Sequence, residues 1–112
     1  MTDVVFFKKD NMICAYECSG HTGYGNRGYD IVCSALSSII QSCALGLRDV
    51  VKAPIKIDRN DEEGYFKVVL LDNMSKDKRD KSQILLETLL LSVKDLAKNY
   101  SKYIKLEQTV VY

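Results

Sequence analysis

Residues 30–58, DIVCSALSSIIQSCALGLRDVVKAPIKID, change their periodicity halfway along and so decide the fold class. Apolar side chains first recur at the spacing of a helix face, which predicts a helix over about residues 30–45: Val32, Leu36, Ile39 and Cys43. Asp30 is the expected N-cap and Gly46 the expected stop. From residue 51 the apolar side chains alternate as in a strand: Val51, Ala53, Ile55 and Ile57. Pro54 places that strand at a sheet edge.

The segments on either side continue the mixture of strands and helices. Residues 2–8 and 12–18 are rich in β-forming side chains and flank a turn at residues 9–11, so a hairpin is expected. Residues 59–64 indicate a turn and residues 65–72 a further strand. We expect residues 74–81 to form a charged connection.

A second helix follows that connection, and a last strand is predicted over residues 102–110. The helix has an expected core row of Leu86, Leu89, Val93, Leu96, Ala97 and Tyr100. The predicted order ββαββαβ contains two hairpins, so strict parallel alternation is excluded. The expected fold is α+β: a two-layer sandwich of a mainly antiparallel sheet with two helices.

Composition limits the function classes. The chain has 112 residues, 46% hydrophobic and 28% charged, which predicts one domain, residues 1–112, with a buried core. A net charge of +1 predicts no direct nucleic-acid binding. Residues 1–10 do not resemble a secretory signal, and no long uninterrupted apolar run follows. We therefore expect a cytoplasmic protein with no membrane partner, whose four cysteines are thiols.

Residues 19–28 form a glycine-rich segment that predicts a mobile loop, with Gly23, Gly25 and Gly28 in a G-x-G-x-x-G pattern. That pattern would hold a dinucleotide pyrophosphate in a Rossmann unit. The rest of the chain lacks the parallel crossover and the acidic residue that such a unit needs, so nucleotide binding is disfavoured.

Zinc binding is the next alternative, since Cys14, Cys18, His21 and Cys33 are close in sequence. Cys14 and Cys18 are four residues apart on a predicted strand, so their sulfur atoms lie on one face but far apart along it, unlike the closely spaced cysteine pairs of zinc sites. We therefore expect no metal site, and interpret Cys14, Cys18 and Cys43 as core side chains.

Nucleophilic catalysis is a sharper hypothesis. His21 is the only histidine and hence the only imidazole available as a general base. Cys33 is expected about three residues into the first helix, where free amides and the helix dipole stabilise a thiolate and an oxyanion. Ser19, Ser34 and Ser37 are weaker nucleophile candidates. The alternative is that Cys33 packs in the core, His21 lies on the surface and Asp30 only caps the helix.

Two motifs resemble the ribosomal-processing cysteine protease (Prp) family. The first is Gly20-His21-Thr22-x5-Gly28-x-Asp30-Ile31-Val32-Cys33-Ser34-Ala35-Leu36-Ser37. The second is Leu96-Ala97-x2-Tyr100-x2-Tyr103-Ile104-Lys105. Thr22, Ser34 and Ser101 depart from the residues common in the family, but the cysteine and the histidine are kept. The resemblance extends over essentially the whole chain.

The resemblance implies a homodimeric cysteine endopeptidase that removes the N-terminal extension of bacterial large-subunit ribosomal protein twenty-seven during ribosome assembly. It implies Cys33 as nucleophile, His21 as base and no cofactor. Asp30 falls on an acidic position of the family, although an N-cap explains it equally well, and Ser37 falls on a serine that helps to shape the site. The alternative is a noncatalytic ribosome-associated binding module.

A dimer surface has one sequence indication of its own. Leu91 lies on the expected solvent row of the second helix, among Glu87, Lys94 and Lys98. A leucine at such a position either faces a partner or is an ordinary isolated surface residue.

Overall fold

The computed structural model describes residues 1–20 and 27–112, and for residues 27–30 it describes the backbone alone. Its elements are β1 (Thr2–Lys9), β2 (Met12–Ser19), α1 (Arg27–Leu45), the π-helix η1 (Gly46–Val51), β3 (Ile55–Asn60), β4 (Tyr65–Leu70), α2 (Lys76–Asn99) and β5 (Ile104–Val110). Apart from η1, this is the predicted order ββαββαβ.

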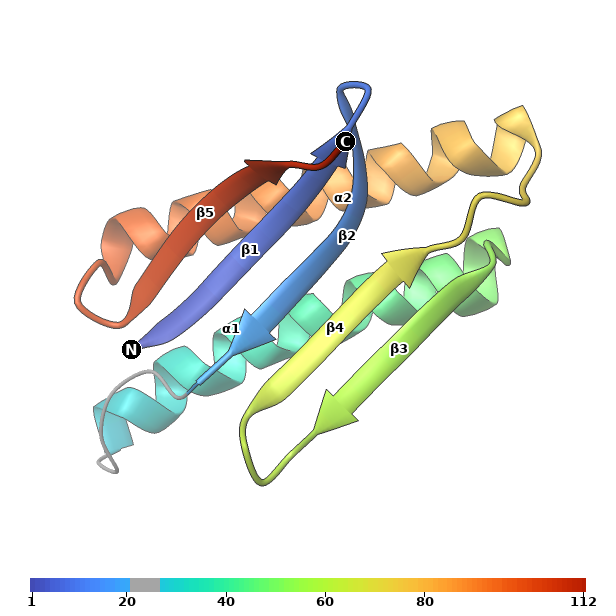
Figure 1. The fold of residues 1–112 in the computed structure, drawn as a ribbon. Coiled ribbons are helices and arrows are strands. Elements are labelled where there is room, and N and C mark those ends of the chain that lie inside the picture. The colour runs from blue at the N-terminus through green and yellow to red at the C-terminus, as the bar shows by residue number, and fades with distance from the viewer. Residues whose placement is uncertain (21–26) are drawn as a thin grey trace.

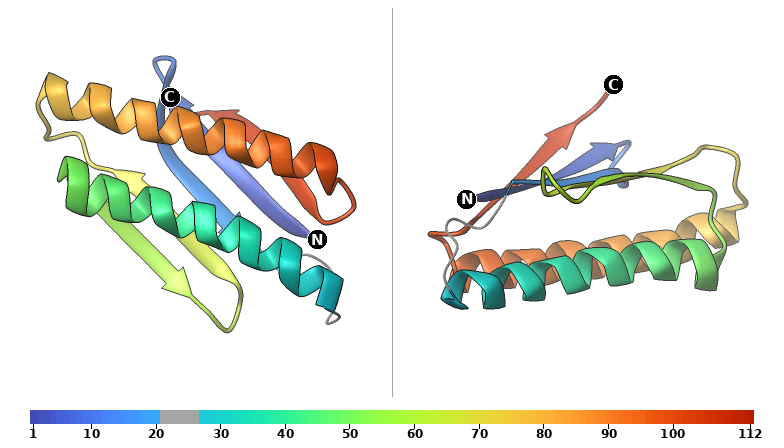
Figure 2. Two further views of the ribbon diagram at one scale, coloured as in Figure 1. Left: turned by 180° about the vertical axis from the view of Figure 1, so that it is seen from behind. Right: turned by 90° about the horizontal axis from the view of Figure 1, so that it is seen from below.

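The strands form one sheet, and both helices cover the same face of it (Figures 1 and 2). The strand order is β3-β4-β2-β1-β5, with antiparallel pairing between β1 and β2, β2 and β4, and β3 and β4. β5 pairs with β1 in parallel, which makes the sheet mixed. The predicted α+β two-layer fold is confirmed, and β3, which Pro54 precedes, lies at an edge as expected.

The β1–β2 hairpin closes through Asp10 and Asn11, whose φ angles are 54° and 63°. Positive φ at both central residues defines the turn that matches the twist of paired strands, and Asp and Asn tolerate it well. The register shifts between Phe7 and Lys8, so a bulge bends the hairpin near this turn.

α1 begins earlier than its apolar pattern indicates. Its first residue is Arg27, so Asp30 is the fourth helical residue and the predicted N-cap at Asp30 is wrong. The predicted loop over residues 19–28 is likewise wrong at both of its ends, because Ser19 belongs to β2 and Gly28 to α1, and its residues 21–26 lie outside the described part of the chain. Residues 27–29 contain no proline, which would break a helix, so the helix can include them although they form no apolar face.

Gly46 does not stop the first helix, which continues as η1. The continuation buries Leu47 completely and ends at Lys52, whose φ of 60° is left-handed. A Cβ on Gly46 would lie 3.1 Å from Leu85 Cδ1, so the glycine allows the start of η1 to pass close to α2. Strand β3 therefore begins at Ile55, and the prediction that it begins at Val51 is wrong.

α2 also begins before its apolar row, within the predicted charged connection. Ser75 is its N-cap and its hydroxyl accepts a hydrogen bond from the Lys78 amide. Two exposed ion pairs span the first turns, Lys76–Asp80 at 2.8 Å and Lys81–Asp77 at 3.0 Å. The N-cap and the i,i+4 ion pairs stabilise a helix in a segment that has no apolar periodicity. At the other end, Tyr100 is the C-cap and β5 begins at Ile104, two residues later than predicted.

The core lies between the helices and the sheet, and polar bonds fix each helix in place. The fully buried Tyr16 donates from its hydroxyl to the Ile40 carbonyl oxygen at 2.9 Å, joining β2 to α1. Gln83 on α2 accepts from the Ile13 amide at 2.9 Å and donates to the Ile13 carbonyl at 2.8 Å.

The segment Ile31–Val51 has the length and apolar composition of a membrane span. Those are also properties of a core helix, and the buried row of this segment packs under the sheet.

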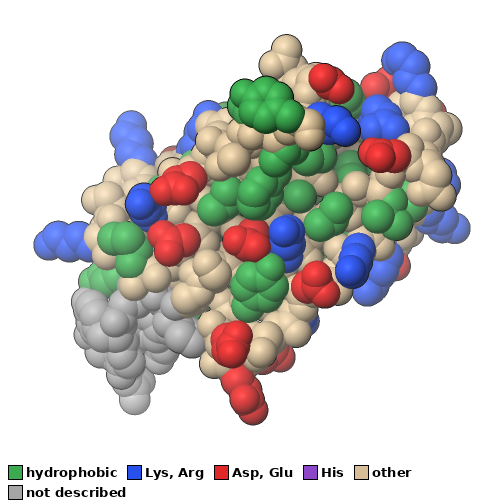
Figure 3. Space-filling model, in the orientation of Figure 1, with side chains coloured by type: hydrophobic (Ala, Val, Ile, Leu, Met, Phe, Trp, Pro, Cys, Tyr) green, Lys and Arg blue, Asp and Glu red, His purple; other side chains and the backbone are tan. Residues whose placement is uncertain are grey.

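Neither α1 nor α2 covers the other face of the sheet, which carries a mixed surface (Figure 3). Phe7 is half-buried there, with the Lys67 ammonium 5.2 Å from its ring centroid. Glu17 accepts a hydrogen bond from the Tyr65 hydroxyl at 2.8 Å and lies 3.8 Å from Lys67 Nζ. The reactive cysteine predicted from the sequence lies on the opposite side, between the layers.

Candidate active site

Cys33 lies on a cavity between α1 and the β3–β4 hairpin. It is the seventh residue of α1 and is half-buried. The cavity has a volume of about 230 Å³ and is closed by α1 on one side, by the hairpin on another and by the ends of β1 and β2 on a third. A partly exposed thiol on the wall of a concave site is accessible to a bound ligand.

α1 presents a polar row to this cavity. Cys33, Ser37 and Gln41 follow one another at four-residue spacing, and all line the cavity. Residues at that spacing are neighbours on one helix face. The Gln41 side-chain amide donates from Nε2 to Ser37 Oγ at 2.8 Å. The cysteine therefore stands at one end of a polar column whose other two members are bonded to each other.

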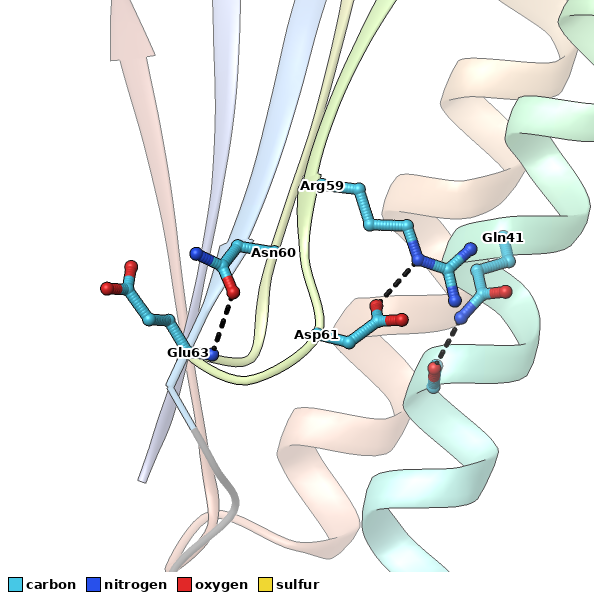
Figure 4. Close-up of polar contacts among 6 residues, drawn as sticks. Gln41, Arg59, Asn60, Asp61 and Glu63 are labelled. Carbon is cyan, nitrogen blue, oxygen red and sulfur yellow. Dashed lines mark hydrogen bonds and ion pairs between the residues drawn. The ribbon is translucent and has the colours of Figure 1, made fainter.

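The hairpin supplies the facing wall. Arg59 Nε donates to Asp61 Oδ1 at 2.6 Å, and the guanidinium lies 5.9 Å from the Phe66 ring centroid. Figure 4 shows Arg59 reaching from the hairpin toward Gln41 on α1. A second hollow of about 310 Å³ shares Gln41, Arg59 and Phe66 with the first and extends past the end of α1 to Arg48 of η1. We call the two adjoining hollows the groove.

The end of β2 forms the third wall. Gly20 follows β2 with a φ of 91°, and its amide donates to the Gly64 carbonyl oxygen of the hairpin turn at 3.1 Å. A Cβ on Gly20 would lie 2.9 Å from the carbonyl oxygen of Met1, so both the backbone angle and the space require glycine. Gly20 thus fixes the direction in which the chain leaves β2 at the edge of the cavity.

Cys18 on β2 is a second cysteine on the same cavity. The pKa of the Cys18 thiol is raised to about 11. Burial is the main cause, and the nearby Cys33 and Asp3 raise this pKa further. Burial also raises the pKa of Cys43 to about 11, although its bond with Tyr16 acts in the opposite direction, and burial raises the pKa of Cys14. These three thiols are therefore neutral at physiological pH and are poor nucleophiles.

The structure corrects how Cys33 relates to the helix start. The unpaired amides of a helix belong to its first four residues, which here are residues 27–30. Cys33 lies beyond them in the second turn, so the prediction that it is about three residues into the helix, among the free amides, is wrong. The dipole also weakens after the first turn. Ser37 is the next polar side chain along the row of Cys33.

Several predicted site residues lie outside the described part of the chain. These are His21, Gly23 and Gly25, and the side chain of Asp30. Among the described side chains, Cys33 and Ser37 share the cavity. Cys43 is buried in the core as predicted, whereas Cys14 is half-buried. No group of three potential metal ligands occurs within residues 1–20 and 27–112.

The sequence interpretation missed four residues of the site: Gln41, Arg59, Asp61 and Phe66. The sequence contains an indication of Gln41, because this residue continues the four-residue spacing of Cys33 and Ser37. It contains no such indication of the hairpin residues, because their approach to α1 depends on how the sheet packs against the helix. Cys18 was assigned to the core, and the structure shows it at the boundary between core and cavity.

A helix-borne thiol on a groove wall is an arrangement typical of thiol hydrolases, and comparison with known proteins gives the class. The sequence model of the family described as cysteine protease Prp matches residues 1–105. This chain belongs to that family, and it is therefore a cysteine protease.

Curated relatives are similar over most of their length. The ribosomal processing cysteine protease Prp of Bacillus subtilis is 20% identical over 102 residues, which cover 91% of each chain. The protein of the same name from Staphylococcus aureus (strain Mu50) is 26% identical over 87 residues, 78% of each chain.

Solved structures share the fold. SMU.848 from Streptococcus mutans superposes with a TM-score of 0.86 and 23% identity, over 99% of this chain and 96% of that one. The ribosomal processing protease Prp from S. aureus, solved in complex with a substrate peptide, has a TM-score of 0.84 and 23% identity, over 97% of this chain and all of that one.

Proposed function

We propose that this protein is an endopeptidase that removes the N-terminal extension of bacterial large-subunit ribosomal protein twenty-seven during ribosome assembly, with Cys33 as nucleophile and His21 as base. The position of Cys33 on the groove wall carries this proposal. The family resemblance supplies the substrate, and the names of the relatives support a ribosomal one. No cofactor is needed for this reaction.

The groove suits an extended peptide. Its lining residues on α1 run from Cys33 to Leu45, which is twelve residues along the helix, or about 18 Å at the rise of an α-helix. An extended chain covers that distance with about five or six residues. Side chains near Cys33 would contact Leu36, Ile40 and Phe66, whereas those farther along would contact Gln41 and Arg59. A cleft of this kind can hold a segment on one side of a scissile bond.

The proposed reaction uses a thiol as nucleophile and an imidazole as base and acid. The Cys33 thiolate attacks the scissile carbonyl carbon, a tetrahedral oxyanion forms, and His21 protonates the leaving amine as the C–N bond breaks. Water then releases the acyl group from the sulfur. Gly20, the residue before His21, lines the cavity of Cys33, which supports this pairing. Asp30 and Ser37 are the proposed supporting residues.

We also propose that the enzyme works in the cytoplasm as a homodimer. Leu91 supports a dimer surface on α2, since 64% of its surface is exposed. Ile84 lies on the same helix, seven residues earlier, and is 66% exposed. Residues at that spacing share a helix face, so both side chains would contact a second copy that packs on this face of α2.

Mass spectrometry of the cleavage products tests the function. The enzyme is incubated with the extended ribosomal protein, and the expected products are the mature protein and the free N-terminal peptide. Cys33→Ala and His21→Ala should fold and lack activity, whereas the control Cys14→Ala, on a strand away from the groove, should cleave normally. Binding of the ribosomal protein without cleavage would instead support a noncatalytic ribosome-associated module.

A further inference from the structure

We infer that Gln41 is a positioning residue that orients the Ser37 hydroxyl toward the carbonyl oxygen under attack at Cys33. This inference rests on the proposed function and adds a residue to it. Cys33, Ser37 and Gln41 occupy successive turns of α1 on the wall of one cavity. Gln41 is two turns from the sulfur, so it acts through Ser37 and not on the reacting atoms.

The direction of the hydrogen bond decides what Ser37 can do. Gln41 Nε2 is a donor, and Ser37 Oγ accepts from it at 2.8 Å. A hydroxyl has one proton and two lone pairs, so accepting from Gln41 leaves the proton for another acceptor. Gln41 therefore holds Ser37 as a hydrogen-bond donor.

Two hydroxyls of α2, those of Thr88 and Ser92, show the usual alternative. Thr88 donates to the Ile84 carbonyl at 2.7 Å and Ser92 to the Thr88 carbonyl at 2.9 Å. Such back-bonding uses the hydroxyl proton within the helix. Ser37 makes no such bond within the described chain, and its hydrogen bond there is the one from Gln41. Its proton is available to a ligand in the cavity.

The carbonyl oxygen of a bound peptide is the acceptor that needs this proton. When the Cys33 sulfur forms a bond to the carbonyl carbon, the π electron pair moves to the oxygen and creates an oxyanion. Neighbouring residues on a helix face have Cβ atoms about 5–6 Å apart, which leaves room for that oxygen between Cys33 and Ser37. Ser37 donates a hydrogen bond and transfers no proton, and its stabilisation grows as negative charge develops.

A double-mutant cycle tests the inference with a peptide that spans the N-terminal extension and the first residues of the mature ribosomal protein. Loss of an oxyanion donor lowers kcat by about 100-fold or more, so Ser37→Ala should fall in that range. Gln41→Met should lower kcat by about 10-fold with little change in KM, because one positioning bond is lost while the Ser37 donor remains. In the Ser37→Ala background, Gln41→Met should have no further effect.

Gln41→Glu separates positioning from packing. Glutamate is nearly the same shape, but its carboxylate can only accept, so Ser37 would donate to it and turn its proton away from the substrate. We expect Gln41→Glu to be slower than Gln41→Met. The control is Gln83→Met, which breaks two bonds to Ile13 far from the groove and should lower the melting temperature while leaving kcat unchanged.

Equal losses from Gln41→Met in the wild-type and Ser37→Ala backgrounds would overturn the inference, because Gln41 would then act independently of Ser37. Wild-type kinetics in Gln41→Glu would overturn it as well. If the wild-type enzyme does not cleave the peptide at all, the proposed function fails first, which distinguishes the two results.

Discussion

The two helices cover the same face of the sheet but are stabilised differently. α2 begins at a serine cap, carries two ion pairs along its first turns and is bonded to β2 through Gln83. α1 also contributes a buried row to the core and accepts the bond from Tyr16 at Ile40, but one of its faces carries the polar row Cys33, Ser37 and Gln41 on the cavity. The comparison indicates that both helices stabilise the domain, and that α1 in addition carries its chemistry.

The largest expected effect is on stability, from a core change in α2. Leu86 is fully buried, so Leu86→Ala should lower the free energy of unfolding by about 2–5 kcal/mol through lost burial and a cavity. Cys33→Ala, on half-buried α1 surface, should change it by less than about 1 kcal/mol while abolishing cleavage. Urea titration of both variants gives the two values. Equal destabilisation would contradict this difference between the two positions.

Thiol alkylation should modify Cys33, on the wall of the cavity, before the other three cysteines. With pKa values of about 11, Cys18 and Cys43 carry roughly one thiolate per thousand molecules at pH 8. Iodoacetamide should therefore modify Cys33 before Cys14, Cys18 and Cys43, as peptide mapping would show. Earlier labelling of Cys43 would refute the proposed difference.

The same pKa values predict how stability depends on pH. Unfolded thiols ionise near pH 8.5, whereas folded Cys18 and Cys43 ionise near 11. Unfolding thus releases protons in this interval, and the free energy of unfolding should fall as the pH rises from about 8.5 toward 11. Melting curves across that range check the direction. A flat profile would show that these thiols are not buried in solution.

A smaller effect is expected at the start of α2. Ser75→Ala removes the side chain that accepts from the Lys78 amide, and loss of such a cap costs about 1 kcal/mol. Cleavage should be unaffected, because the cap lies outside the groove. A Ser75→Asp control restores an acceptor beside the positive end of the helix and should recover the wild-type melting temperature.

The smallest change in folding stability is expected at Leu91. Its exposed side chain should tolerate Leu91→Lys within about 0.5 kcal/mol, yet a charge there should weaken a dimer formed over α2. Sedimentation velocity at several concentrations measures this. A dimer that persists unchanged would remove Leu91 from the interface.

Most of the fold could be predicted from local patterns, but its boundaries could not. The hairpins follow from alternation and turn residues, and the helix cores from their apolar rows. The starts of both helices were missed because residues 27–29 and 76–81 have no apolar face, and the second is held by caps and ion pairs. η1 depends on burying Leu47 under the sheet, and the parallel pairing of β5 with β1 brings together the two ends of the chain.

The same limit applies to the site. Cys33 and Ser37 were identified because they belong to a sequence motif. Arg59, Asp61 and Phe66 approach α1 only because the hairpin packs beside it, and that contact has no signature within the segment. Gln41 lies between these cases, since helical spacing predicts its place on the row but not its bond to Ser37.

The most direct test of the account is to capture the acyl group during turnover. Enzyme and extended peptide are mixed, the reaction is quenched in acid within its first turnover, and the modified residue is located by peptide mapping. We predict a thioester on Cys33 whose added mass equals that of the free N-terminal peptide less one water, and its disappearance in Cys33→Ala. Cleavage that proceeds with an acyl group on another residue, or that persists in Cys33→Ala, would contradict the assignment of Cys33 as the nucleophile.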